Sequence, residues 1–201
     1  SLNYRLFLFL TSVTTTLLYG SSPSLCVDTA GSDCSAERMI LLSDTNIFLD
    51  LECIGLLEDV MALPDVVCTE LMLFRDEIRR PLYLKNKLLL LGLNVVQATN
   101  EEFALSQQIQ DMVRQLSAYD CIMYAVAKSR KYILITSDKR LRQTSESAGV
   151  ETHGLLFLID KCIAHGTPKD HIETAIREII RNPKILIPTK IILDKYAQYL
   201  E

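Results

Sequence analysis

Short apolar runs alternate with longer stretches of helical periodicity along most of the chain. Apolar runs bounded by polar residues are typical of buried parallel strands, and apolar residues three and four positions apart are typical of helices packed on a sheet. The pattern predicts strands over residues 39–42, 65–68, 94–97, 132–136 and 150–152. It predicts helices over residues 47–57, 69–80, 99–116, 117–131, 139–148, 154–164, 168–182 and 188–200.

This order of elements predicts an α/β fold, because strands that alternate with helices form parallel sheets. We expect a three-layer αβα arrangement with a central, mostly parallel sheet, followed by C-terminal helices. The expected division is a leader or non-native extension over residues 1–38, an α/β domain over residues 39–166, and a C-terminal helical extension over residues 167–201.

Two interpretations of residues 1–38 stay open. Arg5 followed by an apolar stretch from Leu6 resembles a signal peptide or membrane anchor, although four threonines interrupt the apolar stretch. The segment is equally consistent with non-native or upstream-translated sequence, because Met39 would be a suitable start beside the first strand. We expect no membrane association unless residues 1–20 are a native signal or anchor.

The composition indicates a folded protein without a global attraction to nucleic acid. Hydrophobic residues make up 49% of the chain, which argues against disorder, and the formal net charge is −4. A nucleic-acid partner would therefore need a local basic patch and a bridging metal ion. The basic residues that flank the strand at 132–136 are candidates for that patch: Lys128, Arg130, Lys131, Lys139, Arg140 and Arg142.

The six cysteines form no CxxC pair and no cluster with histidine, which argues against a zinc site. Four of them lie in apolar helical or strand contexts, where buried free thiols are common. These four are Cys53, Cys68, Cys121 and Cys162. Reduced cysteines favour a cytoplasmic location.

Four acids lie at the ends of predicted elements, where a parallel sheet gathers side chains. Asp44 and Asp138 follow strands, Glu70 opens a helix after a strand, and Asp120 lies in the first turn of another helix. Crowded carboxylates repel one another unless a cation lies between them. Magnesium and manganese prefer oxygen ligands, so the four acids predict a divalent-metal site that cleaves phosphodiester bonds.

Each acid also has an ordinary structural interpretation, and these alternatives stay open. Asp120 completes a capping box with Ser117, and Asp138 is a plain helix N-cap. Asp44 fits a turn into a helix, and Glu70 fits a first-turn acid. Only their joint placement on alternating strands and helices favours a chemical role.

The ordered set of motifs resembles the PIN-domain nucleases, most closely the small prokaryotic ones paired with antitoxins. Residues 40–50, ILLSDTNIFLD, resemble the first strand and acid of that family, and CTELMLF around Glu70 resembles its second acid. Residues 116–142, LSAYDCIMYAVAKSRKYILITSDKRLR, resemble the third acid, its helix and the fourth acid. Residues 149–166, GVETHGLLFLIDKCIAHG, resemble the strand and helix that close the fold.

The resemblance implies an endoribonuclease that depends on Mg²⁺ or Mn²⁺. Asp44 and Asp120 would bind the metal most directly, while Glu70 and Asp138 would complete the shell or orient water. Supporting hydrogen bonds would come from Thr45, Asn46, Thr136 and Ser137. Asp76 or Glu77 would replace Glu70 if the latter is only structural. The implied partners are an RNA substrate, an antitoxin protein and a second copy in a homodimer.

Two other function classes compete with the enzyme. The first is a catalytically silent PIN-like module, in which the acids dock a basic segment of a partner protein. The second is a structural subunit that self-associates through the C-terminal helices. Tyr119 and Tyr124 fit either base stacking or core packing, and core packing is the more ordinary role.

Overall fold

The computed structural model describes residues 38–200. The interpretations of the leader, including the signal or anchor at residues 1–20, concern residues that lie outside this range. Among the described helices, none combines the length and the hydrophobicity that crossing a membrane requires.

A five-stranded sheet lies at the centre of the described residues, and its strands follow the order β3-β2-β1-β4-β5. All four neighbouring pairs are parallel, and β5 lies at one edge as the sequence predicts. The strands are β1 (Ile40–Ser43), β2 (Val66–Glu70), β3 (Asn94–Val96), β4 (Ile133–Ile135) and β5 (Thr152–His153). The expectation of a central parallel sheet is confirmed.

Side chains alternate across this sheet and so assign the helices to its two faces. Leu41 belongs to one buried cluster and its neighbour Leu42 to the other. The first cluster joins α1 (Thr45–Ile54), α2 (Leu57–Met61), α4 (Leu84–Leu90), α8 (Leu155–Ala164), α9 (Lys169–Arg181) and α10 (Thr189–Tyr196). The second joins α3 (Leu71–Asp76), α5 (Asn100–Met112), α6 (Ala118–Arg130) and α7 (Lys139–Ser147). The fold is therefore the predicted three-layer αβα arrangement.

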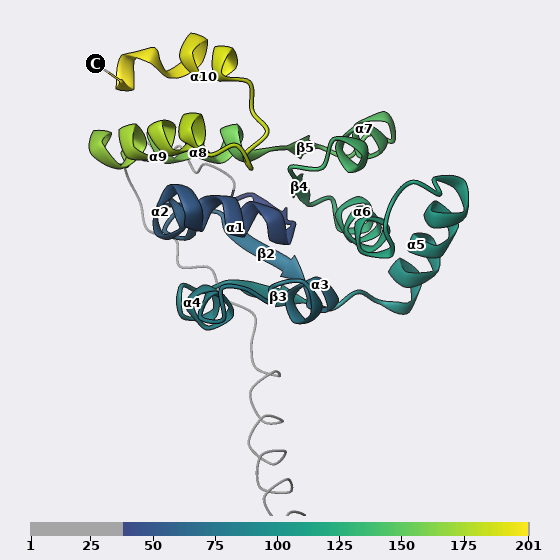
Figure 1. Ribbon diagram of the computed structural model, residues 1–201. Helices are drawn as coiled ribbons and strands as arrows, with labels where there is room; N and C mark the ends of the chain where they lie inside the picture. Colours follow the sequence, from purple (N-terminus) through teal and green to yellow (C-terminus); the bar gives the residue numbers. More distant parts are fainter. Residues whose placement is uncertain (1–37, 201) are drawn as a thin grey trace, which may run out of the picture. The chain divides into compact units, whose positions relative to one another are not determined.

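The helices after residue 166 share the core of the sheet. Ile172 and Ile176 of α9 and Ile192 of α10 are fully buried in the same cluster as Leu41. Figure 1 shows α10 beside α9. Burial of aliphatic side chains stabilises this arrangement by about 1.5–3 kcal/mol for each. The short 3-10 helix Ala197–Tyr199 follows α10.

Tyr196 connects α10 to α8 by hydrogen bonds inside the core. Its hydroxyl donates to the Leu156 carbonyl at 3.2 Å and to Asp160 Oδ1 at 2.9 Å, and its side chain is fully buried. We expect Tyr196→Phe to lower the free energy of unfolding by about 1 kcal/mol, because one hydroxyl bridge is lost without a large cavity. Chemical denaturation measures this change, and Tyr199→Phe, which removes a half-exposed hydroxyl, is the control. An unchanged midpoint in Tyr196→Phe would contradict this role.

Several helices differ from the predicted ones. Helix α3 ends at Asp76 rather than near residue 80, because Ile78 packs in the first cluster whereas Leu73 packs in the second. Helix α5 ends at Met112, before Leu116. Helix α4 was missed in the sequence, since the apolar run from Leu88 to Leu91 hides the four-residue spacing of Leu84 and Leu88.

One cysteine departs from its expected environment. Cys68, Cys121 and Cys162 are buried free thiols, as predicted, but Cys53 is exposed. It lies on the outer side of α1, where the Asn182 side-chain amide donates to its sulfur at 3.0 Å. Its neighbours Leu51 and Ile54 take the buried positions of that turn instead.

Candidate functional site

The carboxyl ends of β1 and β4 form the point at which the strand order reverses. From β1 the chain continues to β2 on one side, and β4 pairs with β1 on the other side. The backbone N–H of Asp44 donates to the Ile135 carbonyl at 3.0 Å, so the two strand ends lie side by side. In open α/β sheets this crevice is the usual place for a ligand site.

Asp44 is buried at this crevice, with 6% of its surface exposed, and its carboxylate accepts hydrogen bonds from two directions. Oδ1 accepts from the Ile47 N–H at 3.0 Å, which makes Asp44 the N-cap of α1. Oδ2 accepts from the Thr136 hydroxyl and from the Ser137 N–H at 3.3 Å. These donors fix the carboxylate at the junction of β1, β4 and α1.

The environment of Asp44 opposes its negative charge. Burial raises the pKa of its carboxyl from 3.8 to about 6, and the hydrogen bonds from Thr136, Ile47 and Ser137 only partly offset that effect. The negative charge of Asp120 raises the pKa further. A buried carboxylate with a second one nearby is stabilised when a cation lies between them.

Asp120 combines a structural role with this electrostatic one. It completes a capping box at the start of α6, where its Oδ2 accepts from the Ser117 N–H at 3.0 Å and from the Ser117 hydroxyl at 2.7 Å. The half-buried carboxylate nevertheless acts on Asp44 from the neighbouring element. The capping interpretation is therefore correct, and it is compatible with a place at the site.

Asp138 is joined to Asp44 through a single threonine. Its N–H donates to Thr136 Oγ1 at 3.0 Å, and the Thr136 hydroxyl donates to Asp44. The carboxylate itself caps α7, since Oδ1 accepts from the N–H groups of Arg140 at 2.8 Å and Leu141 at 2.7 Å. Asp138 is exposed and lines a hollow at the edge of the crevice.

Glu70 lies at the end of β2, next to β1, but its carboxylate is occupied. The side chain is fully buried, Oε2 accepts from the Met72 N–H at 2.6 Å, and Oε1 accepts from the Ala98 N–H at 3.3 Å. The two bonds connect the start of α3 to the segment that follows β3. The geometry therefore gives Glu70 a structural task at the edge of the site.

We expect Glu70→Gln to destabilise the protein by about 1–3 kcal/mol. The glutamine NH₂ group would face one of the two backbone donors, Met72 or Ala98, and leave a buried N–H without an acceptor. Urea denaturation measures the change. A variant as stable as the wild type would show that neither oxygen is needed as an acceptor.

Glu77 and Asp76 approach the site from the end of α3. The Thr45 hydroxyl donates to Glu77 Oε2 at 2.6 Å, directly beside Asp44 in the chain, and the Tyr119 hydroxyl donates to Asp76 Oδ2 at 3.4 Å. A hollow of about 360 Å³ collects these side chains and Asn46. Glu77 is thus better exposed to a ligand in the crevice than Glu70 is. Tyr119 lines this hollow, whereas Tyr124 is buried in the core.

Asp50 was missed in the sequence analysis. It lies one turn after Asn46 on α1, and the Ser137 hydroxyl donates to its Oδ2 at 3.2 Å. Burial raises the pKa of the Asp50 carboxyl, and only the Ser137 hydroxyl acts in the opposite direction. The signal in the sequence was an acid four residues after Asn46, and therefore on the same face of the helix.

The residues of the predicted basic patch are divided between the amino ends and the carboxyl ends of the strands. Helix α6 begins at the site and has 13 residues, so its last turn lies about 20 Å away. Lys128 and Lys131 consequently line a hollow at the amino end of β4, beside Ile133. The Arg130 side chain forms an ion pair with Glu102 at 2.7 Å. Of the six basic residues, those of α7 lie at the edge of the site: Lys139, Arg140 and Arg142.

The donor set suits a hard divalent cation, although the four acids do not form one compact cluster. Within residues 38–200, no three carboxylate, imidazole or thiol side chains converge closely enough to hold a metal ion by themselves. Magnesium is usually held by one or two carboxylates and several waters. Asp44 and Asp120 are the candidates for such a pair, and the buried charge of Asp44 has no cation to offset it among the groups that shift its pKa.

The chain was compared with models of protein families. The family model described as the PIN domain matches residues 41–147, which include all four predicted acids. A search of curated proteins gave no match.

Proposed function

The chain belongs to the PIN domain family, and we propose that it is a metal-dependent nuclease that cleaves RNA at the crevice around Asp44. A PIN domain indicates a nuclease. The observation that supports metal-dependent cleavage at this crevice is the buried Asp44 carboxylate. It is positioned by three hydrogen-bond donors and repelled by the charge of Asp120.

In this proposal Asp44 and Asp120 hold Mg²⁺ or Mn²⁺, and Asp138 and either Glu70 or Glu77 complete the acidic set. The bound ion supplies an activated water and neutralises charge on the phosphate. The Thr136 hydroxyl and the Ser137 N–H hold Asp44 Oδ2 in a fixed orientation. The Ile47 N–H holds Oδ1, so the carboxylate plane is set before a ligand arrives.

Three adjoining hollows support an extended single-stranded substrate. The hollow beside Glu77 shares Asn46 and Leu49 with a second one of about 540 Å³, and that one shares Asp50 and Ser137 with a third. Each contains a basic side chain. They are Arg79, Lys184 and Arg142. The exposed side chains of Arg79 and Lys184 are suited to phosphates of the RNA backbone, despite the net charge of −4.

The proposal is tested with purified protein and a labelled single-stranded RNA. We expect cleavage with Mn²⁺ or Mg²⁺ and none with EDTA. Calcium, which binds oxygen ligands but with looser geometry, should support much less cleavage. Cleavage that persists in EDTA, or no cleavage with any divalent ion, would contradict the proposal.

The catalytically silent interaction module is the second candidate, and a specific observation favours it. Asp44, Glu70, Asp120 and Asp138 all accept hydrogen bonds from the starts of helices, so each has a structural use. In that case Mn²⁺ would not raise the melting temperature. A metal-dependent nuclease would be stabilised, because an ion that binds only the folded state shifts the unfolding equilibrium.

We propose a toxin role with an antitoxin protein as the partner, a homodimer, and a cytoplasmic location. Induced expression in a bacterial host would then stop growth, and Asp44→Asn would not. Light scattering tests the dimer.

A further inference from the structure

We propose that the cavity beside Ser137 is a specificity pocket for a guanine base of the RNA strand; this inference rests on the proposed nuclease function. The pocket lies between α1, the start of α7, the start of α8 and the segment before α10. Asp50, Ser137, Arg142 and Gly154 form its polar part. Aliphatic side chains form the rest, from Leu155, Leu156, Ile185, Ile187, Pro188 and Ile191.

Ser137 connects this pocket to the acidic site. Its N–H donates to Asp44 Oδ2 at 3.3 Å, while its hydroxyl donates to Asp50 Oδ2 at 3.2 Å. One residue therefore touches the carboxylate of the cleavage site and the carboxylate of the pocket. A base in the pocket would belong to a nucleotide next to the phosphate at Asp44.

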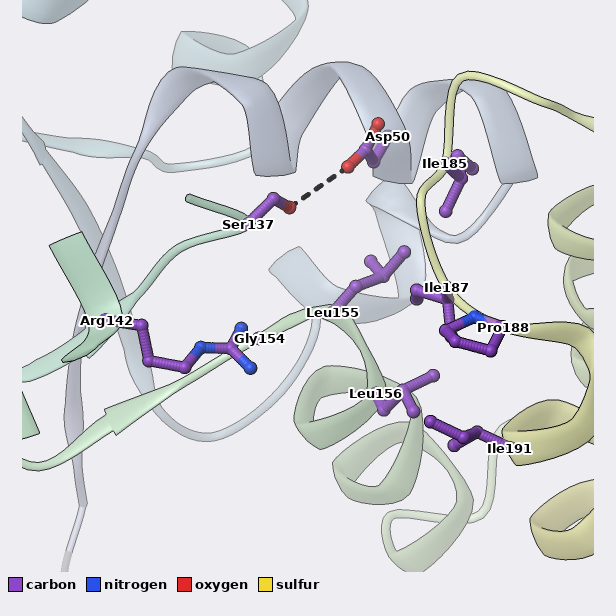
Figure 2. A pocket seen from close by; sticks show the side chains of 10 residues that line it. All are labelled: Asp50, Ser137, Arg142, Gly154, Leu155, Leu156, Ile185, Ile187, Pro188 and Ile191. Atoms are coloured by element: carbon purple, nitrogen blue, oxygen red, sulfur yellow. Dashed lines mark hydrogen bonds between the residues drawn. The ribbon is translucent and has the colours of Figure 1, made fainter. Parts of the chain in front are cut away.

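The size and walls of the pocket suit one planar base. Its volume is about 250 Å³, just below the range of about 300–1,000 Å³ that is typical of sites for drug-sized ligands. Figure 2 shows Ile187 and Ile191 facing Leu155 and Leu156, with Arg142 beside Gly154 on the opposite side and Asp50 above Leu155. Unstacked RNA bases are held in this way, between apolar side chains with polar groups at their edges.

Arg142 supplies the hydrogen-bond donors of the pocket. Its Nη2 donates to the Thr136 carbonyl at 2.7 Å, which holds the guanidinium beside Gly154 (Figure 2). Its Nε is buried, and no acceptor for it is found among the described residues. A buried donor without an acceptor is costly unless a ligand supplies one. Gly154 makes room for this group, because a Cβ there would lie 2.2 Å from Nη2.

Asp50 supplies the acceptors. A carboxylate only accepts hydrogen bonds, whereas an arginine only donates them. Guanine offers N1–H and N2–H donors on one edge and the O6 and N7 acceptors on another, so it matches both groups. Adenine presents its N6 donor where guanine has an acceptor, and therefore leaves one of the two protein groups without a partner.

The test measures nucleoside binding to the full chain in EDTA by NMR chemical-shift titration. We expect guanosine to bind at least about 10-fold more tightly than adenosine, cytidine or uridine. Asp50→Asn should remove that preference, and Asp44→Asn should keep it. Equal binding of the four nucleosides, a preference for another base, or no binding would overturn the proposal.

Two tryptophan substitutions on α10 provide a matched pair. Ile191 lines the pocket and is 47% exposed, whereas Leu193 is 44% exposed and does not line it. Ile191→Trp should fill the pocket and abolish guanosine binding, while Leu193→Trp should bind normally. Equal binding by the two variants would contradict the assignment. A further variant, Gly154→Ala, should weaken binding by displacing the Arg142 guanidinium.

RNA cleavage separates the two proposals. Metal-dependent cleavage without guanosine binding would overturn the pocket and leave the nuclease intact. Guanosine binding without cleavage would overturn the nuclease and leave the guanine pocket intact. If both hold, cleavage of an RNA with a single guanosine should occur next to that base, and Ile191→Trp should cut without this preference.

Discussion

Asp44→Asn is expected to abolish RNA cleavage, with a loss of about 10³-fold or more, while the protein stays folded. The substitution keeps the shape of the side chain and one accepting oxygen, and asparagine is a good N-cap for α1. It removes the negative charge that we propose holds the metal ion. The measurement is the single-turnover cleavage rate in Mn²⁺, with circular dichroism to confirm folding.

Asp65, a buried carboxylate at the amino end of β2, provides the matched control. Asp65 precedes β2, and its side chain accepts from the Met39 N–H at 3.1 Å and pairs with Lys161 at 2.5 Å. Asp65→Asn also removes a buried negative charge, so it should lower stability. Its cleavage rate per folded molecule should equal that of the wild type. If Asp44→Asn cleaves as fast as Asp65→Asn does, Asp44 has no catalytic role.

The second large effect is a loss of stability as the pH rises in metal-free protein. The pKa of Asp44 is about 6 in the folded state and near 3.8 in the unfolded state. Between pH 3.8 and about pH 6 the folded state binds more protons than the unfolded state does, so raising the pH favours unfolding. The shift corresponds to about 3 kcal/mol of stability that is present below pH 4 and lost by pH 7.

Urea denaturation in EDTA at several pH values tests this linkage. Because other carboxyl groups also titrate, the informative quantity is the difference between wild type and Asp44→Asn. The variant should gain up to about 3 kcal/mol relative to the wild type between pH 4 and pH 7. A constant difference would show that Asp44 titrates normally. At pH 7, Mn²⁺ should stabilise only the wild type, since the cation offsets the buried charge.

The helices and strands and their order along the chain were predictable, because each is marked by a local pattern of apolar and polar residues. The apolar run around Leu134 and the capping pattern of Ser117 and Asp120 each fit one element, and the structure has both. The acids were found because strand ends and helix starts are visible as changes of pattern. Asp44 and Asp138 lie close together because the parallel strands β1 and β4 pair, so that their carboxyl ends meet.

The pocket beside Ser137 could not be predicted, because no local pattern encodes it. Its lining comes from α1, the β4–α7 turn, α8 and the segment before α10, which are far apart in the sequence. The opposite placement of Lys128 and Lys131 was missed for a related reason, since the length of α6 separates its two ends. Whether Glu70 or Glu77 faces the crevice also depends on where α3 ends, and boundaries of short helices are poorly marked in sequence.

We infer that Asp44 and Asp120 hold one divalent cation at the carboxyl ends of β1 and β4. Anomalous diffraction from crystals soaked in Mn²⁺ tests it directly. We predict a manganese peak bonded to carboxylate oxygens of both residues. A peak that contacts neither residue, or no peak at a Mn²⁺ concentration that supports cleavage, would contradict the account.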